Sequence, residues 1–320
     1  MRMIAIKNRG SRWCVLLAGL LSVACATGTT GAASSQGNST ARTALLEDVS
    51  SWVYQLQNVD VDELGESEFD LAVVDYSADG SDDEAYSAEN VETMKGSGSS
   101  EKLVIAYLSI GEAEDYRYYF DAEAAYMDEE NPEWPGNFKV HYWEEGWQAT
   151  IESYVDRLIA AGFDGAYLDI IDGYEYYGPG GESGLERASA ADDMANFVIR
   201  IANYARESDE DFLIFPQNGS GIINDSSLED EYLSAIDGIG AEDTFYFGDE
   251  DENNDLDEQT GVIENLEVFR TAEKTVLAVD YLTDEDKLDD FYERALANGY
   301  VPYATERALD VFVVNDGHAP

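Results

Sequence analysis

The sequence predicts an α/β fold, a single-domain (β/α)8 TIM barrel, and three observations indicate it. Short apolar runs alternate along the chain with longer segments of helical periodicity, as in a parallel sheet covered by helices. Residues 43–320 have about the length of one such barrel. Carboxylates recur at the C-terminal ends of the apolar runs. In a parallel barrel those ends surround one mouth, where the active sites of such barrels lie.

The predicted strands follow in order along the chain, each an apolar run between turn residues or helical segments. They are 53–56, 69–75, 103–112, 164–169, 212–216, 236–242, 276–280 and 300–304. Apolar residues at helical spacing precede the later strands, within 147–159, 194–201, 262–269 and 288–296. An open doubly wound sheet is the alternative architecture. No glycine-rich phosphate-binding sequence follows the first strand, which disfavours nucleotide binding, and we expect no cofactor.

The charge of the chain is strongly acidic. Asp and Glu number 68 against 18 Lys and Arg, for a formal charge of -50. A hydrophobic content of 44% with 12% aromatic residues supplies a packed core, so the charge does not indicate disorder. We interpret it as a halophilic surface that stays hydrated in concentrated salt. It argues against nucleic acid as a partner, because binding phosphates requires basic patches.

The N-terminus has the pattern of a targeting segment. Basic residues precede a short apolar run, and residues 1–26 are predicted to be a signal peptide. The sequence before Cys25 is similar to a lipoprotein box, so a lipoprotein-type signal peptide with Cys25 as the lipidated residue is the alternative. Residues 27–42, rich in Gly, Ser and Thr, predict a flexible linker. We therefore expect the protein outside the cell, free or anchored to the outer face of the membrane.

Composition narrows the chemistry to carboxylates. The only cysteines, Cys14 and Cys25, lie in the leader, and His141 and His318 are far apart in sequence. A thiol nucleophile, a Ser-His-Asp triad and a histidine zinc site are therefore disfavoured. Two acids on different strands can cleave a glycosidic bond, with retention or inversion of configuration. A metal site made of Asp75, Glu112 and Asp169 stays open. The acidic loop 249–258 lacks the pattern of a calcium-binding EF-hand loop, and we interpret it as solvated.

Three segments carry a family resemblance: 52–57 (WVYQLQ), 107–114 (YLSIGEAE) and 163–172 (FDGAYLDIID). They resemble the endo-α-1,4-polygalactosaminidase family of glycoside hydrolases, some of whose secreted prokaryotic members carry a label likening them to cysteinyl-tRNA synthetase. The similarity extends over nearly the whole of residues 43–320. It implies a (β/α)8 barrel that cleaves within α-1,4-linked galactosamine-containing polymers, with a catalytic Asp after the fourth strand and a catalytic Glu after the sixth.

On this sequence those positions are Asp169, as nucleophile or charge stabiliser, and Glu242, as acid/base. Asp243 competes with Glu242 for the second role. Other polar residues at predicted strand ends are candidates for substrate contact, and structural hydrogen bonding is the alternative for them: Asp75, Tyr107, Glu112, Asp172, Gln217, Asn218 and Asp280. Asp164 lies at the opposite end of its strand and is predicted to be a turn residue.

The functional hypothesis is a secreted or surface-anchored, halophilic glycoside hydrolase that acts within an amino-sugar polysaccharide. Its partner would be that polymer, and we expect a monomer. A barrel that binds carbohydrate without cleaving it is the alternative, because architecture alone does not fix function. Aromatic residues in the long connections 115–143 and 174–177 could stack on sugar rings or pack the loops onto the barrel.

Overall fold

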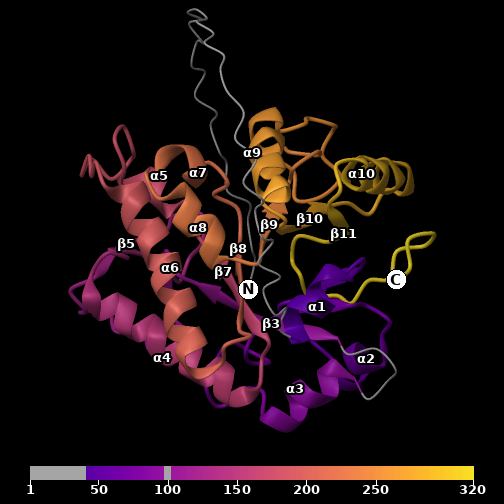
Figure 1. Cartoon of the computed structure of the whole chain (residues 1–320), viewed down its shortest axis with the longest axis horizontal. Coiled ribbons are helices and arrows are strands. Elements are labelled where there is room, and N and C mark those ends of the chain that lie inside the picture. Colours follow the sequence, from indigo (N-terminus) through magenta and orange to yellow (C-terminus); the bar gives the residue numbers. More distant parts are fainter. Residues whose placement is uncertain (1–40, 97–101) are drawn as a thin grey trace, which may run out of the picture.

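The computed structural model describes residues 41–96 and 102–320, and its strands confirm the predicted barrel fold (Figure 1). Parallel strands in these ranges pair in the order β1-β2-β3-β7-β8 and β9-β10-β11. Their bounds are β1 Trp52–Tyr54, β2 Leu71–Val74, β3 Leu103–Ser109, β7 Gly165–Asp169, β8 Leu213–Pro216, β9 Gly238–Glu242, β10 Thr275–Tyr281 and β11 Val301–Thr305. A parallel bridge between Gln217 and Gly240 joins β8 to β9. On the other side, the Trp52 indole donates to the Val301 carbonyl at 2.9 Å and joins β1 to β11.

Helices surround these strands (Figure 1). They are α1 Ala41–Glu47, α2 Val61–Glu66, α3 Ala88–Lys95, α4 Glu145–Ala161, α5 Gly173–Tyr177, α6 Ala190–Ser208, α7 Ile222–Asp225, α8 Glu229–Ala235, α9 Thr260–Thr271 and α10 Glu285–Ala297. The predicted apolar stripes face the barrel: Trp147, Ile151 and Leu158 of α4 are fully buried. Among the described residues, no helix is both long and apolar enough to cross a membrane.

The barrel interior is filled by aromatic rings rather than by aliphatic layers alone. Trp52 stacks on Tyr54 with ring centroids 5.8 Å apart, and Tyr54 lies 5.4 Å from Tyr167. Tyr303 contacts Trp52 from β11 at 5.9 Å. Such ring pairs add to the stabilisation from apolar burial. The upper rings of this cluster, Tyr54 and Tyr167, form the base of the mouth described below.

The third predicted strand was too long, and the correction concerns Glu112. β3 ends at Ser109, and Glu112 instead begins β4 (Glu112–Glu114). The chain turns because the Ser109 hydroxyl donates to the Glu112 carbonyl at 3.0 Å and accepts from the Glu112 amide at 3.3 Å. Gly111 permits this turn, since a Cβ there would lie 2.3 Å from the Ile170 carbonyl oxygen. β4 then pairs antiparallel with β6 (Asn137–Val140), which pairs with β5 (Met127–Glu130).

At the N-terminal ends of the strands, carboxylates connect neighbouring segments. Asp164 is not merely a turn residue, because it is buried and accepts from the Val104 amide of β3 at 2.8 Å. Lys95 and Arg42 also bind it, at 2.7 and 2.8 Å. Arg42 lies in α1, so the predicted linker, ending at residue 42, extends into a helix. The rest of that linker and the predicted leader with Cys25 lie outside the described residues.

Candidate active site

Asp169 and Glu242, the two acids expected to be catalytic, are the last residues of β7 and β9, and both are partly exposed. Asp169 accepts a hydrogen bond from the Tyr107 hydroxyl at 2.7 Å and one from the Ile170 amide at 2.8 Å. Burial, and then the charge of Glu242, raise the pKa of the Asp169 carboxyl well above its usual value. The structure therefore places the two acids close enough for the charge of one to raise the pKa of the other.

Glu242 is held by two donors from neighbouring strands. Asn218, after β8, donates its amide to one carboxylate oxygen at 2.9 Å and accepts from the Glu242 backbone amide at 3.0 Å. The Tyr281 hydroxyl, at the end of β10, donates to the other oxygen. These two hydrogen bonds fix the orientation of the Glu242 carboxylate. Such orientation by surrounding donors is what a proton-transferring carboxylate needs.

Asp243, the competitor for the second catalytic role, is engaged elsewhere. Both of its oxygens accept from the Arg307 guanidinium at 2.9 Å. A bidentate ion pair of this kind occupies both carboxylate oxygens, and Arg307 opposes the burial that raises the pKa of Asp243. The geometry therefore favours Glu242 as the second acid.

The backbone is strained at three positions beside these acids. Ile170, Asn218 and Asp243 have φ values of 61°, 58° and 50°, a region that residues other than glycine rarely adopt. Each costs on the order of 1–3 kcal/mol. Ile170 and Asp243 directly follow Asp169 and Glu242, so the strain lies where the chain leaves β7 and β9. Backbone strain of this kind clusters at functional sites.

Gln217 and two tyrosines lie beneath the carboxylate pair. The pKa values of Tyr54 and Tyr167 are raised, first by burial and also by the charges of both Glu242 and Asp169. Gln217 is 1% exposed, and its side-chain oxygen accepts from the Tyr167 hydroxyl. Its side-chain amide nitrogen is buried with no hydrogen-bond partner among the described residues. The predicted substrate contact of Gln217 is not tested by this geometry.

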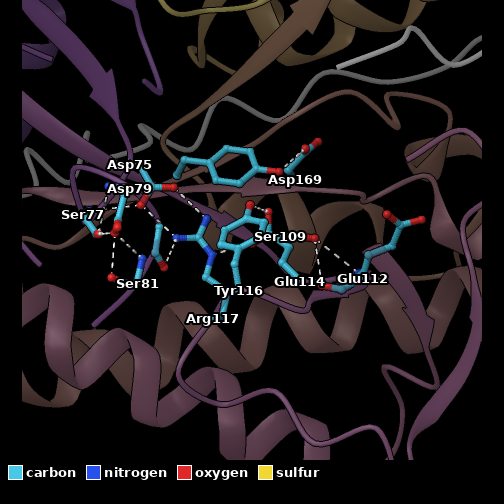
Figure 2. Close-up of polar contacts among 12 residues, drawn as sticks. Asp75, Ser77, Asp79, Ser81, Ser109, Glu112, Glu114, Tyr116, Arg117 and Asp169 are labelled. Carbon is cyan, nitrogen blue, oxygen red and sulfur yellow. Dashed lines mark hydrogen bonds and ion pairs between the residues drawn. The ribbon is translucent and has the colours of Figure 1, made fainter. Parts of the chain in front are cut away.

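Asp75 lies in a buried ion network, not free in the mouth (Figure 2). Its two oxygens accept from Arg117 at 2.8 and 2.7 Å, and Arg117 also binds Glu114 at 2.6 Å. The Tyr116 hydroxyl donates to Glu114. Tyr107 links this network to Asp169, because its hydroxyl donates to Asp169 and its pKa is raised by burial, then by Asp169 and Glu114. The contacts of Asp75 are those of a structural residue, and its predicted substrate contact stays untested.

We expect Arg117→Met to be strongly destabilising. It leaves Asp75 and Glu114 buried without their cation, a change that costs about 3–5 kcal/mol. The measurement is the urea midpoint of unfolding. Arg157→Met is the matched control, since Arg157 pairs with Asp82 on the surface, where both side chains are about 40% exposed, and such pairs contribute about 1 kcal/mol or less. Equal losses in the two variants would contradict the role assigned to the network.

Two further predicted contact residues lie on the side of the mouth formed by β4–β6. Glu112 is buried and accepts from Asn131 at 2.8 Å, with Lys139 at 3.8 Å. Asp172, at the start of α5, makes no side-chain cap, and its carboxylate accepts no hydrogen bond from another described residue. Burial raises the pKa of Asp172 to about 6, helped by the charges of Glu175 and Glu242. Asp172 is therefore a carboxylate in the mouth with oxygens available to a ligand.

Asp280 has the contacts of a loop anchor. It is fully buried, and its carboxylate accepts from the backbone amides of Thr244, Phe245 and Tyr246 at 2.8–3.1 Å. It holds the segment that follows Glu242. Its predicted contact with substrate stays untested.

The described residues contain no group of three or more His, Cys, Asp or Glu side chains arranged to hold a metal ion. In the acidic loop 249–258, the Lys287 ammonium donates to the carbonyls of Asn253 and Asn254 at 2.7 and 2.8 Å, so a lysine supplies the positive charge there.

Most of the aromatic residues in the long connections pack against the core, as where Tyr119 contacts Trp147 at 5.5 Å.

Comparison with known proteins places this chain in a family. The model of the glycoside-hydrolase family GH114 matches residues 31–319. The chain belongs to family GH114. Uncharacterized proteins of Methanocaldococcus jannaschii and Thermotoga maritima are 40% identical over 274 residues and 39% over 280, covering 81% and 83% of this chain and 77% and 83% of theirs.

Solved structures share the fold of this GH114 chain. The Aspergillus fumigatus Ega3 complex with galactosamine has a TM-score of 0.62 at 16% identity, covering 82% of this chain and 92% of that one. The glycoside hydrolase domain of PelA from Pseudomonas aeruginosa has a TM-score of 0.62 at 18% identity, covering 82% and 97%. At these identities the likeness supports the fold alone.

The sequence did not indicate several residues of the candidate site. Tyr281, Tyr54 and Arg307 were missed, and so was Arg117. Tyr281 directly follows Asp280 at a strand end, so the rule that selected the acids could have found it. Arg307 has no such signal, because it follows the last strand in an irregular segment.

Proposed function

We propose that this GH114 glycoside hydrolase cleaves within α-1,4-linked galactosamine-containing polysaccharide, using Asp169 and Glu242. The observation that carries the proposal is the pair itself: two partly buried carboxylates at strand ends, which interact through their charges and are each oriented by their own donors. Glu242 protonates the glycosidic oxygen as its bond to the anomeric carbon breaks. Asp169 stabilises or bonds to that carbon, and water completes the hydrolysis. Burial, and then the charge of Glu242, raise the pKa of Asp169, which supports two carboxylates that interact within one site.

Substrate chemistry follows from the charges around the pair. Asp172 offers an unpaired carboxylate, and the mouth carries Glu112 and Glu242 as well, which suits ammonium groups on an amino-sugar polymer. The galactosamine in the Ega3 complex agrees with this class of sugar. The leader-like N-terminus and the charge of -50 support an enzyme that works outside the cell in salt, secreted or tethered, and we expect a monomer.

The test is release of oligosaccharides from partially de-N-acetylated α-1,4-galactosaminogalactan in molar salt. We expect soluble oligomers of mixed length from the native protein, as cleavage within the chain produces. Binding of the polymer without release, by a protein that remains folded, would favour the non-catalytic carbohydrate-binding alternative. Activity that required a divalent cation, lost with a chelator and restored by the metal, would favour the metal-dependent alternative.

We expect Asp172→Asn to weaken action on amino-sugar polymer while stabilising the fold. Because burial raises the folded pKa of Asp172 to about 6, its ionisation costs stability as pH rises from about 4 to 6. The variant should therefore gain about 1–2 kcal/mol at pH 7 and nothing at pH 4, a figure reduced for partial exposure. KM for the de-N-acetylated polymer should rise.

Unfolding by urea at both pH values and KM for acetylated and de-N-acetylated polymer check this prediction. Glu210→Gln is the control, since it removes an exposed carboxylate at the opposite end of the barrel. An equal rise in KM on both polymers would exclude an ammonium contact at Asp172.

A further inference from the structure

Arg307 connects the last barrel strand to the acid at the end of β9. It follows β11 and is 8% exposed. Its three guanidinium nitrogens are all engaged: two donate to Asp243 at 2.9 Å, and Nε donates to the Asp251 carbonyl at 3.0 Å. The guanidinium also lies over the ring of Tyr281, 4.0 Å from its centroid. A planar cation held on every side in this way has one position.

Tyr281 transmits that position to Glu242. Its ring is 3% exposed, with Arg307 on its face, and its hydroxyl donates to a Glu242 oxygen. A cation over the ring attracts its π electrons and so favours a stronger hydroxyl donor. The contact fixes the ring and therefore the direction of the hydrogen bond to the acid.

We propose that Arg307 is a positioning residue for the GH114 reaction, which orients Tyr281 against Glu242 and offsets the charge of Asp243 beside that acid. The inference rests on the proposed function, because it assigns Glu242 the role of general acid. It does not place Arg307 in contact with substrate.

The effect of the Arg307 charge depends on all the titratable and charged groups that surround Glu242. They come from β1, β7, β10 and the segments after β7, β9 and β11: Tyr54, Tyr167, Asp169, Asp172, Asp243, Tyr281 and Arg307. Arg307 is the only cation in this set, and Asp243 is the acid paired with it. Removing the cation should disfavour negative charge at this end of the mouth, and removing the charge of Asp243 should favour it.

The test is the pH profile of kcat/KM for oligosaccharide release, whose basic limb reports the general acid. With Arg307→Gln the limb should move to higher pH by about half a unit or more, and kcat should fall about tenfold with little change in KM. With Asp243→Asn the limb should move to lower pH. The double variant should return toward the native limb, and Arg307→Lys, which keeps the charge, should stay near it.

If Arg307 contributed packing alone, the basic limb would stay in place in Arg307→Gln and in Asp243→Asn, or would move in the same direction in both. Either result would overturn the proposal. A second measurement does not depend on activity. Urea midpoints of Arg307→Gln, Glu242→Gln and the double variant should be non-additive at neutral pH and additive in acid, where carboxylates are protonated. Additive midpoints at every pH would refute the coupling. An inactive native protein that shows the coupling would refute the proposed function instead.

Discussion

Asp169→Asn should abolish oligosaccharide release, with a fall in kcat of about 10⁴-fold or more, as for removal of other catalytic nucleophiles. The side chain keeps its shape, so the Tyr107 hydroxyl and the Ile170 amide retain a neighbour at the same place. The loss should therefore be chemical, with near-native polymer binding. Residual activity above about 1% of native would contradict a direct role in the reaction.

The same variant should be more stable than the native protein at neutral pH. Burial and Glu242 raise the folded pKa of Asp169 above its unfolded value, so the native protein loses stability as pH rises above about 4. The amide has no such loss. Urea midpoints at pH 4 and pH 7 measure it, and the gain should appear only at pH 7. Increased stability with lost activity is typical of a functional site whose charged groups destabilise the folded protein.

Glu242→Gln should reduce kcat on polymer by about 10²–10⁴-fold, the contribution typical of general acid catalysis. The reduction should depend on the leaving group. An aryl α-glycoside of the galactosamine oligomer departs without protonation, so its first turnover should be nearly native in Glu242→Gln and absent in Asp169→Asn.

Asp243→Asn is the matched control for that experiment, because Asp243 is the neighbouring acid with its oxygens on Arg307. Its kcat at the optimum pH should fall less than about tenfold. A larger loss in Asp243→Asn than in Glu242→Gln would assign the acid role to Asp243. If both catalytic variants lost the aryl glycoside equally, the proposed order of roles would be wrong.

The barrel could be predicted because buried parallel strands consist of local apolar runs. The strand-end positions of Asp169 and Glu242 could be predicted because these residues close two of those runs, whereas their proposed roles rest on the family resemblance. The residues that surround these two acids could not be predicted in this way. Tyr281 lies 39 residues from Glu242, and Arg307 lies 64 from Asp243. Contacts at such separations depend on which strand ends meet, which no local pattern states. Glu112 was misplaced for a related reason: the apolar run continues through Ile110, but the Ser109 hydroxyl turns the chain.

α1 has a consequence for orientation at a cell surface. Arg42 binds Asp164 and Asp209, which precede β7 and β8, at 2.8 and 2.6 Å. α1 therefore lies at the end of the barrel opposite Asp169 and Glu242. An anchor at Cys25 would place this end toward the lipid and direct the mouth outward, toward polymer in the surroundings. Cleavage of large, undissolved polysaccharide by the tethered form, at a rate per molecule equal to that of the free form, is the result expected of such an arrangement.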